Sequence, residues 1–166
     1  MTTEAACGSA PATIGNVGCG FDVLGLAVSG LSDRVIATRA SHGDVRIAGI
    51  TGDDGRLPVD AAKNTAGVAA WHTRERAGAA GVGIDLHVEK GIPLESGLGS
   101  SAASAAAAAH AVNQLLGAPL RKGDLIGPCV EAEAIVAGRH ADNVAPALLG
   151  GLTLVPAIEP RPMVQR

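Results

Sequence analysis

The stretch Lys90-Gly91-Ile92-Pro93-Leu94-Glu95-Ser96-Gly97-Leu98-Gly99-Ser100-Ser101-Ala102-Ala103-Ser104 places a short glycine loop directly before a run of alanines. Gly97 and Gly99 allow backbone angles that other residues avoid, and they bring bare N–H groups close to a ligand. Alanine is the best helix former, and Ser100 and Ser101 stand where that helix would begin. Because open N–H groups and the helix dipole favour negative charge at a helix start, the stretch predicts a phosphate-binding loop.

Length and composition indicate one folded domain. The 166 residues are enough for one hydrophobic core and hardly for two. The chain is 47% hydrophobic but has one Phe, one Trp and no Tyr, so Ala, Val, Leu and Ile must build that core. A net charge of −3 without a basic cluster argues against a nucleic-acid partner.

Cysteine usage and hydropathy bear on the compartment. The three cysteines include no close pair, which suits a reducing compartment and neither a disulfide framework nor a zinc site. The longest apolar runs are alanine-rich and shorter than a membrane span, and the N-terminus does not resemble a signal peptide. We therefore expect a cytoplasmic protein without a membrane partner, and the oligomeric state is left open, a homodimer included.

The residue pattern predicts an α+β fold. Alternating apolar residues over 82–88 form the clearest strand, and residues 4–12 are weakly extended. The other expected strands are 23–29 and 34–39 around a turn at 29–33, then 44–50 and 148–155. Helices are expected over 61–77, with Asp60 as its N-cap, and over 101–116 and 124–137. Since strands and helices do not alternate regularly, α+β is favoured over a doubly wound sheet.

Other phosphate-binding classes do not fit the chain. It contains no Gly-Lys-Ser or Gly-Lys-Thr, so the loop is not a Walker A motif. Gly15, Gly18 and Gly20 give only a broken dinucleotide fingerprint without the apolar strand that should precede it.

Three stretches together resemble one superfamily of enzymes. Residues 93–103 are similar to the phosphate-binding motif of the GHMP small-molecule kinases, which act on galactose, homoserine, mevalonate and phosphomevalonate. Residues 10–25 (Ala-Pro-Ala-Thr-Ile-Gly-Asn-Val-Gly-Cys-Gly-Phe-Asp-Val-Leu-Gly) resemble the first motif of its homoserine kinases, and residues 140–151 (His-Ala-Asp-Asn-Val-Ala-Pro-Ala-Leu-Leu-Gly-Gly) resemble their third. The three motifs stand in the family's order. Thr13, Ile14 and Cys19 depart from its usual pattern.

The resemblance implies a fold and an activity. The fold is the GHMP-kinase N-terminal domain, a ribosomal-protein-like two-layer α/β sandwich, expected over 1–156 and followed by a Pro-rich tail over 157–166. The second, ferredoxin-like domain of the family is expected to be absent from this chain, which ends at Arg166. The activity is transfer of the γ-phosphate of ATP to the hydroxyl of L-homoserine, giving O-phospho-L-homoserine for threonine biosynthesis. A mevalonate- or sugar-type kinase and a catalytically incomplete nucleotide-binding fragment remain as alternatives.

The resemblance also implies a site for ATP and Mg²⁺. The metal would be held by Ser101, favoured over Ser100, and by one carboxylate. Glu131 and Glu133 are two residues apart on one expected helix, so only one can face the cleft, and family spacing favours Glu133. The residues expected to bind the nucleotide are Asn64, Lys90, Pro93, Glu95, Ser96, Gly97, Leu98, Gly99, Ser100, Ser101 and Ala102. Asn64 could instead be an ordinary polar residue in the first turn of a helix. Lys90 could instead end a strand in solvent.

The acceptor side is expected in the two outer motifs. By resemblance Asp22 contacts the amino group or hydroxyl of homoserine and Asn16 a neighbouring polar group, although both residue types are also common in glycine-rich turns. His140 and Asp142 are expected as substrate contacts. Asn143 stands where related kinases carry an aspartate base, so we expect it, with Ser101, to act by positioning, and the metal and phosphates to activate the hydroxyl.

Overall fold

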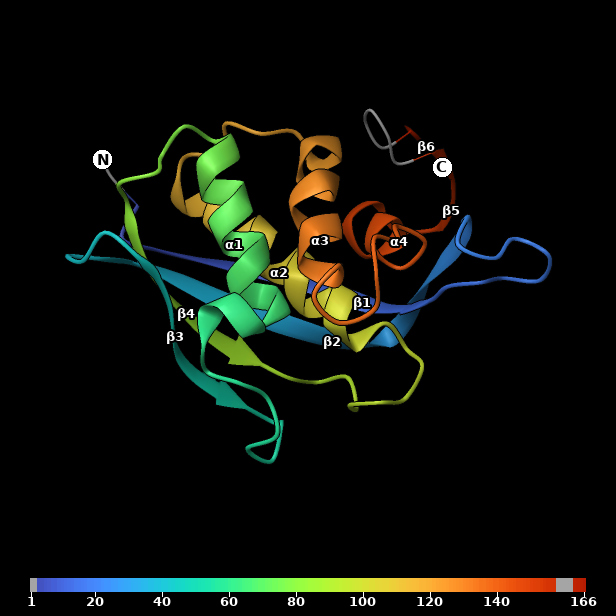
Figure 1. The fold of residues 1–166 in the computed structure, drawn as a ribbon, viewed down its shortest axis with the longest axis horizontal. Coiled ribbons are helices and arrows are strands. Elements are labelled where there is room, and N and C mark those ends of the chain that lie inside the picture. The colour runs from blue at the N-terminus through green and yellow to red at the C-terminus, as the bar shows by residue number, and fades with distance from the viewer. Residues whose placement is uncertain (1–2, 158–162) are drawn as a thin grey trace.

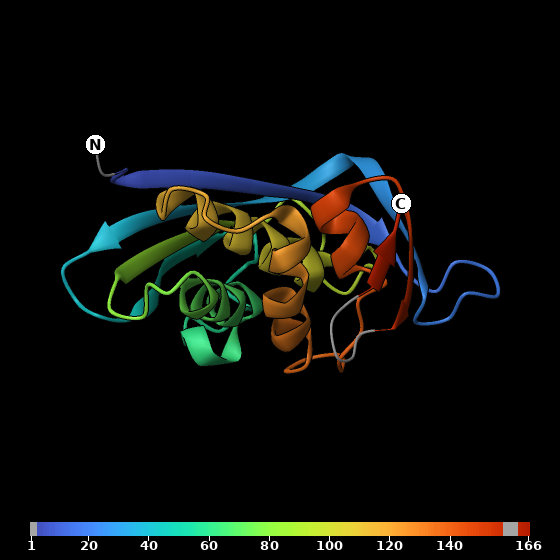
Figure 2. The ribbon, with the colours of Figure 1, turned by 90° about the horizontal axis from the view of Figure 1, so that it is seen from above.

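A single mixed β-sheet covered by helices on one face organises the molecule (Figures 1 and 2). The structure, a computed structural model, describes residues 3–157 and 163–166. The sheet order is β3-β4-β2-β5-β6, with β1 paired to β2. The strands are β1 (Ala5–Ile14), β2 (Leu24–Ala40), β3 (Val45–Thr51), β4 (Gly83–Glu89), β5 (Leu152–Ala157) and β6 (Met163–Gln165). The expected two-layer α+β architecture is confirmed.

Four α-helices form the second layer in the described part of the chain. Its helices are α1 (Thr65–Arg76), α2 (Ser100–Leu115), α3 (Ile126–Glu133) and α4 (Val144–Leu149), with 3-10 turns η1 (Ala61–Lys63) and η2 (Lys122–Leu125). Asp60 caps η1, whereas Asn64 caps α1, so the helix expected over 61–77 is two elements with separate caps. The helix expected over 124–137 ends at Glu133, and the start of the strand expected over 148–155 lies in α4.

The expected pair of strands around 29–33 is one long strand, β2, and this prediction was wrong. Its partner β1 pairs Pro11 with Ser32 and then Ala12 with Val28, so residues 29–31 form a bulge in β2. Gly30 has a φ of 100°, which explains the turn-like composition at that point. Beyond the bulge β2 pairs with β4, and β2 thus becomes the central strand.

Helix α2 fills the middle of the core with small side chains. Every residue from Ala102 to Ala109 is buried. A Cβ on Gly8 of β1 would lie 2.1 Å from the Ala107 carbonyl oxygen, so the helix backbone lies directly on the sheet. The segment expected as a tail carries β6, which pairs with β5, and residues 158–162 lie outside the described residues.

Within the described ranges, no helix has the length and apolar composition needed to cross a bilayer.

Candidate active site

The glycine loop joins the end of β4 to the first turn of α2. Gly99 adopts a left-handed conformation with a φ of 61°, and α2 begins at Ser100, one residue before the helix expected over 101–116. Its N-cap residue, Gly99, makes no side-chain capping hydrogen bond, so the first N–H groups of the helix are left open to a ligand. Glu95 also has a positive φ, 58°, which is uncommon for a residue other than glycine. The loop is therefore an open, partly strained cradle suited to an anion.

A buried carboxylate fixes the base of this loop. Asp33 Oδ1 accepts hydrogen bonds from the backbone N–H groups of Gly91 and Ile92, each at 3.0 Å. Its Oδ2 accepts from Ser104 Oγ of α2 at 2.8 Å and pairs with the ammonium of Lys90. Both charged side chains are almost completely buried, at 0% and 1% exposure. One aspartate of the bulged strand thus ties together β2, the loop and α2.

Burial lowers the pKa of Lys90, and the charge of Asp33 opposes that shift. The Lys90 ammonium also donates to Ser104 Oγ at 2.7 Å and to the Ser100 carbonyl at 3.0 Å. Lys90 therefore lines the pocket in front of the loop without offering a free cation to it. It does not end a strand in solvent either, so that alternative was wrong.

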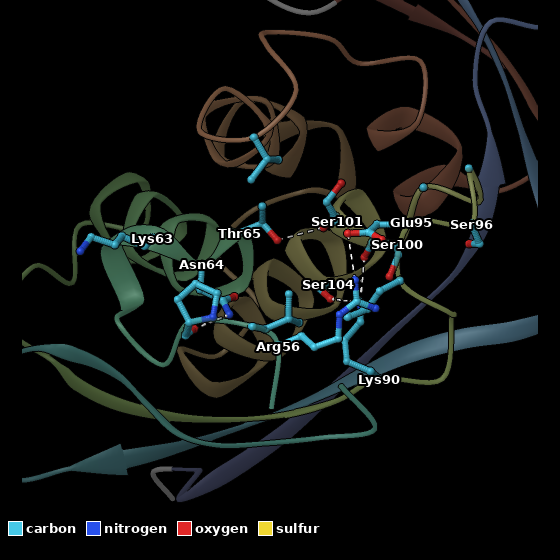
Figure 3. Close-up of a pocket in the computed structure, with 16 residues that line it drawn as sticks. Arg56, Lys63, Asn64, Thr65, Lys90, Glu95, Ser96, Ser100, Ser101 and Ser104 are labelled. Carbon is cyan, nitrogen blue, oxygen red and sulfur yellow. Dashed lines mark hydrogen bonds and ion pairs between the residues drawn. The ribbon is translucent and has the colours of Figure 1, made fainter. Parts of the chain in front are cut away.

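A pocket of about 390 Å³ opens in front of the loop (Figure 3). Arg56 crosses it to reach Glu95, with 2.9 Å between Arg56 Nη2 and Glu95 Oε1. Lys63 lies at the far end and points away in Figure 3. The lining is completed by Leu57, Pro58, Asn64, Thr65, Lys90, Leu94, Ser96, Gly97, Gly99, Ser100, Ser101, Ser104 and Val136.

Most of the expected nucleotide residues line this pocket; Pro93, Leu98 and Ala102 do not. Asn64 lies at the pocket wall, yet both ends of its carboxamide are used. Its Oδ1 accepts from the Ala66 N–H at 3.0 Å, and its Nδ2 donates to the Pro58 carbonyl at 2.9 Å. Asn64 thus shapes the wall as a helix cap.

The two residues expected to hold the metal are in contact. Ser101 Oγ donates to Glu133 Oε2 at 3.0 Å, and the Glu133 side chain is buried. Burial raises the pKa of Glu133, and the Ser101 hydrogen bond partly opposes this. Its second oxygen, Oε1, is buried without a hydrogen-bond partner in the described part of the chain. Glu131 instead pairs with Arg139 at 2.7 Å on the surface.

This pair fits a divalent cation that also binds phosphate. A buried carboxylate oxygen without a donor is costly unless a proton or a cation meets it. The described residues contain no group of three His, Cys, Asp or Glu side chains able to hold a metal by themselves. Mg²⁺ commonly takes one or two carboxylates together with substrate phosphates and waters, which is the donor set available beside the loop.

The expected acceptor residues form one network, which adjoins Gly99 through Asn143. Asp142 Oδ2 accepts from the Asn16 N–H at 3.0 Å, and Asn16 Oδ1 accepts from the Asp22 N–H at 2.9 Å. Asp22 pairs with His140 across 3.2 Å; Asp22 is exposed and His140 is half-exposed. Asp142 is 2% exposed. Because its carboxylate accepts the Asn16 N–H, it supports the turn that carries Asn16 and Asp22. Those two residues have positive φ values of 56° and 58°.

Several residues that line or support the pocket were missed by the sequence analysis. Asp33 was assigned to a turn, and residues 51–58 were given neither an element nor a role, so neither Asp33 nor Arg56 was expected in the site. Asp53 organises that loop, since its buried carboxylate accepts the Leu57 N–H at 3.1 Å and this bond lowers its pKa. Thr65 and Ser104 carried no signal of their own.

The chain is similar to known proteins both in sequence and in fold. The GHMP kinases N terminal domain family matches residues 64–151, a little over half of the chain. Homoserine kinases of Chlorobium phaeovibrioides and Chlorobium phaeobacteroides (strain DSM 266) are 44% and 46% identical to it over 95% of its length. The chain spans 52% of each of these relatives, about half of their length.

Solved structures agree in fold. A homoserine kinase from Cytophaga hutchinsonii superposes with a TM-score of 0.92 and 46% identity, covering 100% of this chain and 52% of that one. The mevalonate kinase of Methanococcus jannaschii, at 15% identity and a TM-score of 0.69 over 89% of this chain and 52% of that one, shares the fold alone. The family match and the open phosphate loop agree, and the chain belongs to the GHMP kinase N-terminal domain family.

Proposed function

We propose that this protein transfers the γ-phosphate of ATP to the hydroxyl of L-homoserine. The observation that carries the proposal is the meeting of two polar sets at Gly99. The open helix start and the Ser101–Glu133 pair follow Gly99 in the chain. The network of Asn16, Asp22 and His140 approaches Gly99 through the neighbouring residues Asp142 and Asn143. Relatives bearing the name homoserine kinase match 95% of the chain, which supports this acceptor.

In the proposed reaction the loop holds the donor. Backbone N–H groups at the start of α2 bind the phosphates, and the helix dipole adds to their effect. Ser101 and Glu133 would hold Mg²⁺, which neutralises charge on the transferring phosphoryl group. Lys90 keeps the loop in place from beneath through Asp33, and Arg56 neutralises Glu95 at the rim.

The acceptor is held from the opposite side. Asp22 offers an exposed carboxylate to an ammonium group, and its neighbour His140 limits where that carboxylate can turn. The Asn143 carboxamide lies between this network and Gly99, and it can position the acceptor hydroxyl. Phosphoryl transfer depends mainly on such positioning and on charge neutralisation, so a dedicated base is not required here.

A coupled assay of ADP release tests the proposal in the full-length protein. We expect turnover with L-homoserine that requires Mg²⁺, and none above background with mevalonate or galactose. The variant Ser101→Ala should weaken the use of Mg-ATP while leaving the fold intact. No turnover with homoserine would refute the proposed acceptor, and turnover with another alcohol would reassign it within the family.

A further inference from the structure

Thr13 is a buried hydroxyl at the point where three distant segments meet. It lies near the end of β1 and has 0% exposure. Its backbone N–H donates to the Leu98 carbonyl of the phosphate loop at 3.0 Å. Its side-chain Oγ1 donates to Oδ1 of Asn143 at 2.9 Å. One residue therefore contacts both the donor loop and the amide that faces the acceptor.

The packing at this point leaves little space. A Cβ on Gly99 would lie 2.1 Å from Thr13 Oγ1 and 2.8 Å from Asn143 Oδ1. Gly99 is thus required for close approach as well as for its left-handed backbone. The carboxamide oxygen of Asn143 is held on the loop side by the threonine hydroxyl.

The nitrogen of the same carboxamide faces the acceptor side. A Cβ on Gly15 would lie 2.6 Å from Asn143 Nδ2, so the NH₂ group borders the turn that carries Asn16 and Asp22. In the part of the chain that the structure describes, Nδ2 has no hydrogen-bond partner, whereas Oδ1 has Thr13. A carboxamide has one accepting and one donating end, so fixing the first fixes the second.

Resting on the proposed function, we propose that Thr13 is a positioning residue that sets the orientation of Asn143. Its hydroxyl holds Oδ1, and the NH₂ is left to donate a hydrogen bond to an oxygen of the acceptor. Without the hydroxyl nothing holds Oδ1 on the loop side, so the carboxamide can rotate by half a turn and the acceptor loses the NH₂ donor. The Thr13 N–H to Leu98 bond does not involve the side chain, so the donor loop keeps its place.

The test compares Thr13→Val with Thr13→Ser in the full-length protein. Valine keeps the shape and removes the hydroxyl, whereas serine keeps the hydroxyl. We expect Thr13→Val to lower kcat by about 10- to 100-fold through misplacement of the acceptor. Thr13→Ser should stay within about twofold, and both variants should keep the ATP dissociation constant within about threefold.

Thr153→Val supplies the matched control. Thr153 is as buried as Thr13, and its Oγ1 donates a single hydrogen bond to the Gly25 carbonyl at 3.2 Å. We expect this variant to lose about as much thermal stability as Thr13→Val and to keep kcat. Equal kcat in wild type and Thr13→Val would overturn the proposal, as would loss of ATP binding in proportion to kcat.

Nuclear magnetic resonance gives a second readout. The side-chain amide pair of Asn143 is assigned by its disappearance in Asn143→Asp. Addition of homoserine with a non-hydrolysable ATP analogue should shift this pair in wild type and Thr13→Ser, and not in Thr13→Val. An equal shift in all three refutes the role of Thr13. If wild type itself turns over no acceptor, the proposed function fails first, and this proposal fails with it.

Discussion

The two sides of the site differ in how firmly the protein holds them. On the donor side the loop is tied to Asp33 and Lys90, which are withdrawn from solvent. On the acceptor side Asp22 and His140 keep side-chain exposures of 61% and 42%. The donor cradle is therefore shaped before any ligand arrives, whereas the acceptor residues remain open to water. Such a difference separates residues that act through stability from residues that act through recognition.

The largest effect is expected from Asp33→Asn. This change leaves the Lys90 ammonium buried without a counter-charge, which should lower the free energy of unfolding by about 3–5 kcal/mol. Denaturant unfolding measures it. The loss of stability should become smaller as the pH rises. Burial lowers the pKa of Lys90, so the folded state loses the buried charge at a lower pH than the unfolded state does, and its relative stability increases.

Two controls sharpen this prediction. Asp22→Asn, on the exposed side, should change stability by less than about 1 kcal/mol. The double variant Asp33→Leu with Lys90→Met removes both charges and should recover part of the stability. Equal losses for Asp33→Asn and Asp22→Asn would erase the difference between the two sides.

Glu133→Gln should separate metal binding from folding. Replacing the proposed metal ligand should weaken Mg-ATP binding by about tenfold or more, measured by calorimetry with and without Mg²⁺. The same variant should gain about 1 kcal/mol of stability at neutral pH, because it removes a buried negative charge that the folded state disfavours.

The pH dependence of this variant follows from the raised pKa of Glu133. The folded chain favours the protonated form, so ionisation of Glu133 costs stability as the pH rises through its pKa. Glu133→Gln should lack this component of the stability profile. In wild type, Mg-ATP binding should weaken on acidification at a higher pH than an ordinary glutamate would give. If Glu133→Gln bound Mg-ATP with unchanged affinity, Glu133 would not be the metal ligand.

The smallest effect is expected from Asp22→Asn on catalysis. Its exposed carboxylate would lose the charge offered to the homoserine ammonium, so the KM for homoserine should rise by about fivefold. The KM for ATP should not change. Steady-state kinetics with each substrate varied in turn measures both. An earlier loss of ATP affinity would place Asp22 on the donor side.

The sequence predicted the elements whose signal is local. Alternation over 82–88 and the serine–alanine boundary at Ser100 correspond to β4 and the start of α2. Glycine and serine around 29–33 were misjudged, because a bulge inside a paired strand has the composition of a turn. The sequence did not predict that 61–77 divides into η1 and α1. Only Asp60 was recognised as a cap, whereas Asp60 caps η1 and Asn64 caps α1.

The site was predictable only where its residues belong to motifs. Glu133 and Ser101 meet across 32 positions of sequence, and spacing alone could favour Glu133 over Glu131 without showing the contact. Asp33 and Thr13 act through partners 58 and 130 positions away. Such long-range contacts depend on sheet register, which the composition of neither segment encodes.

The buried alanines of α2 reduce the conformational entropy that is lost when the phosphate loop is ordered. A buried alanine has no side-chain rotamers to lose, so this helix is ordered at little cost beyond its backbone. It also has no alternative rotamers through which a strain could relax. The phosphate loop is attached to the end of a rod that lies directly on the sheet at Gly8. Any side chain at Gly8, alanine included, would therefore press on the helix backbone and displace α2 together with the anion cradle at its N-terminal end.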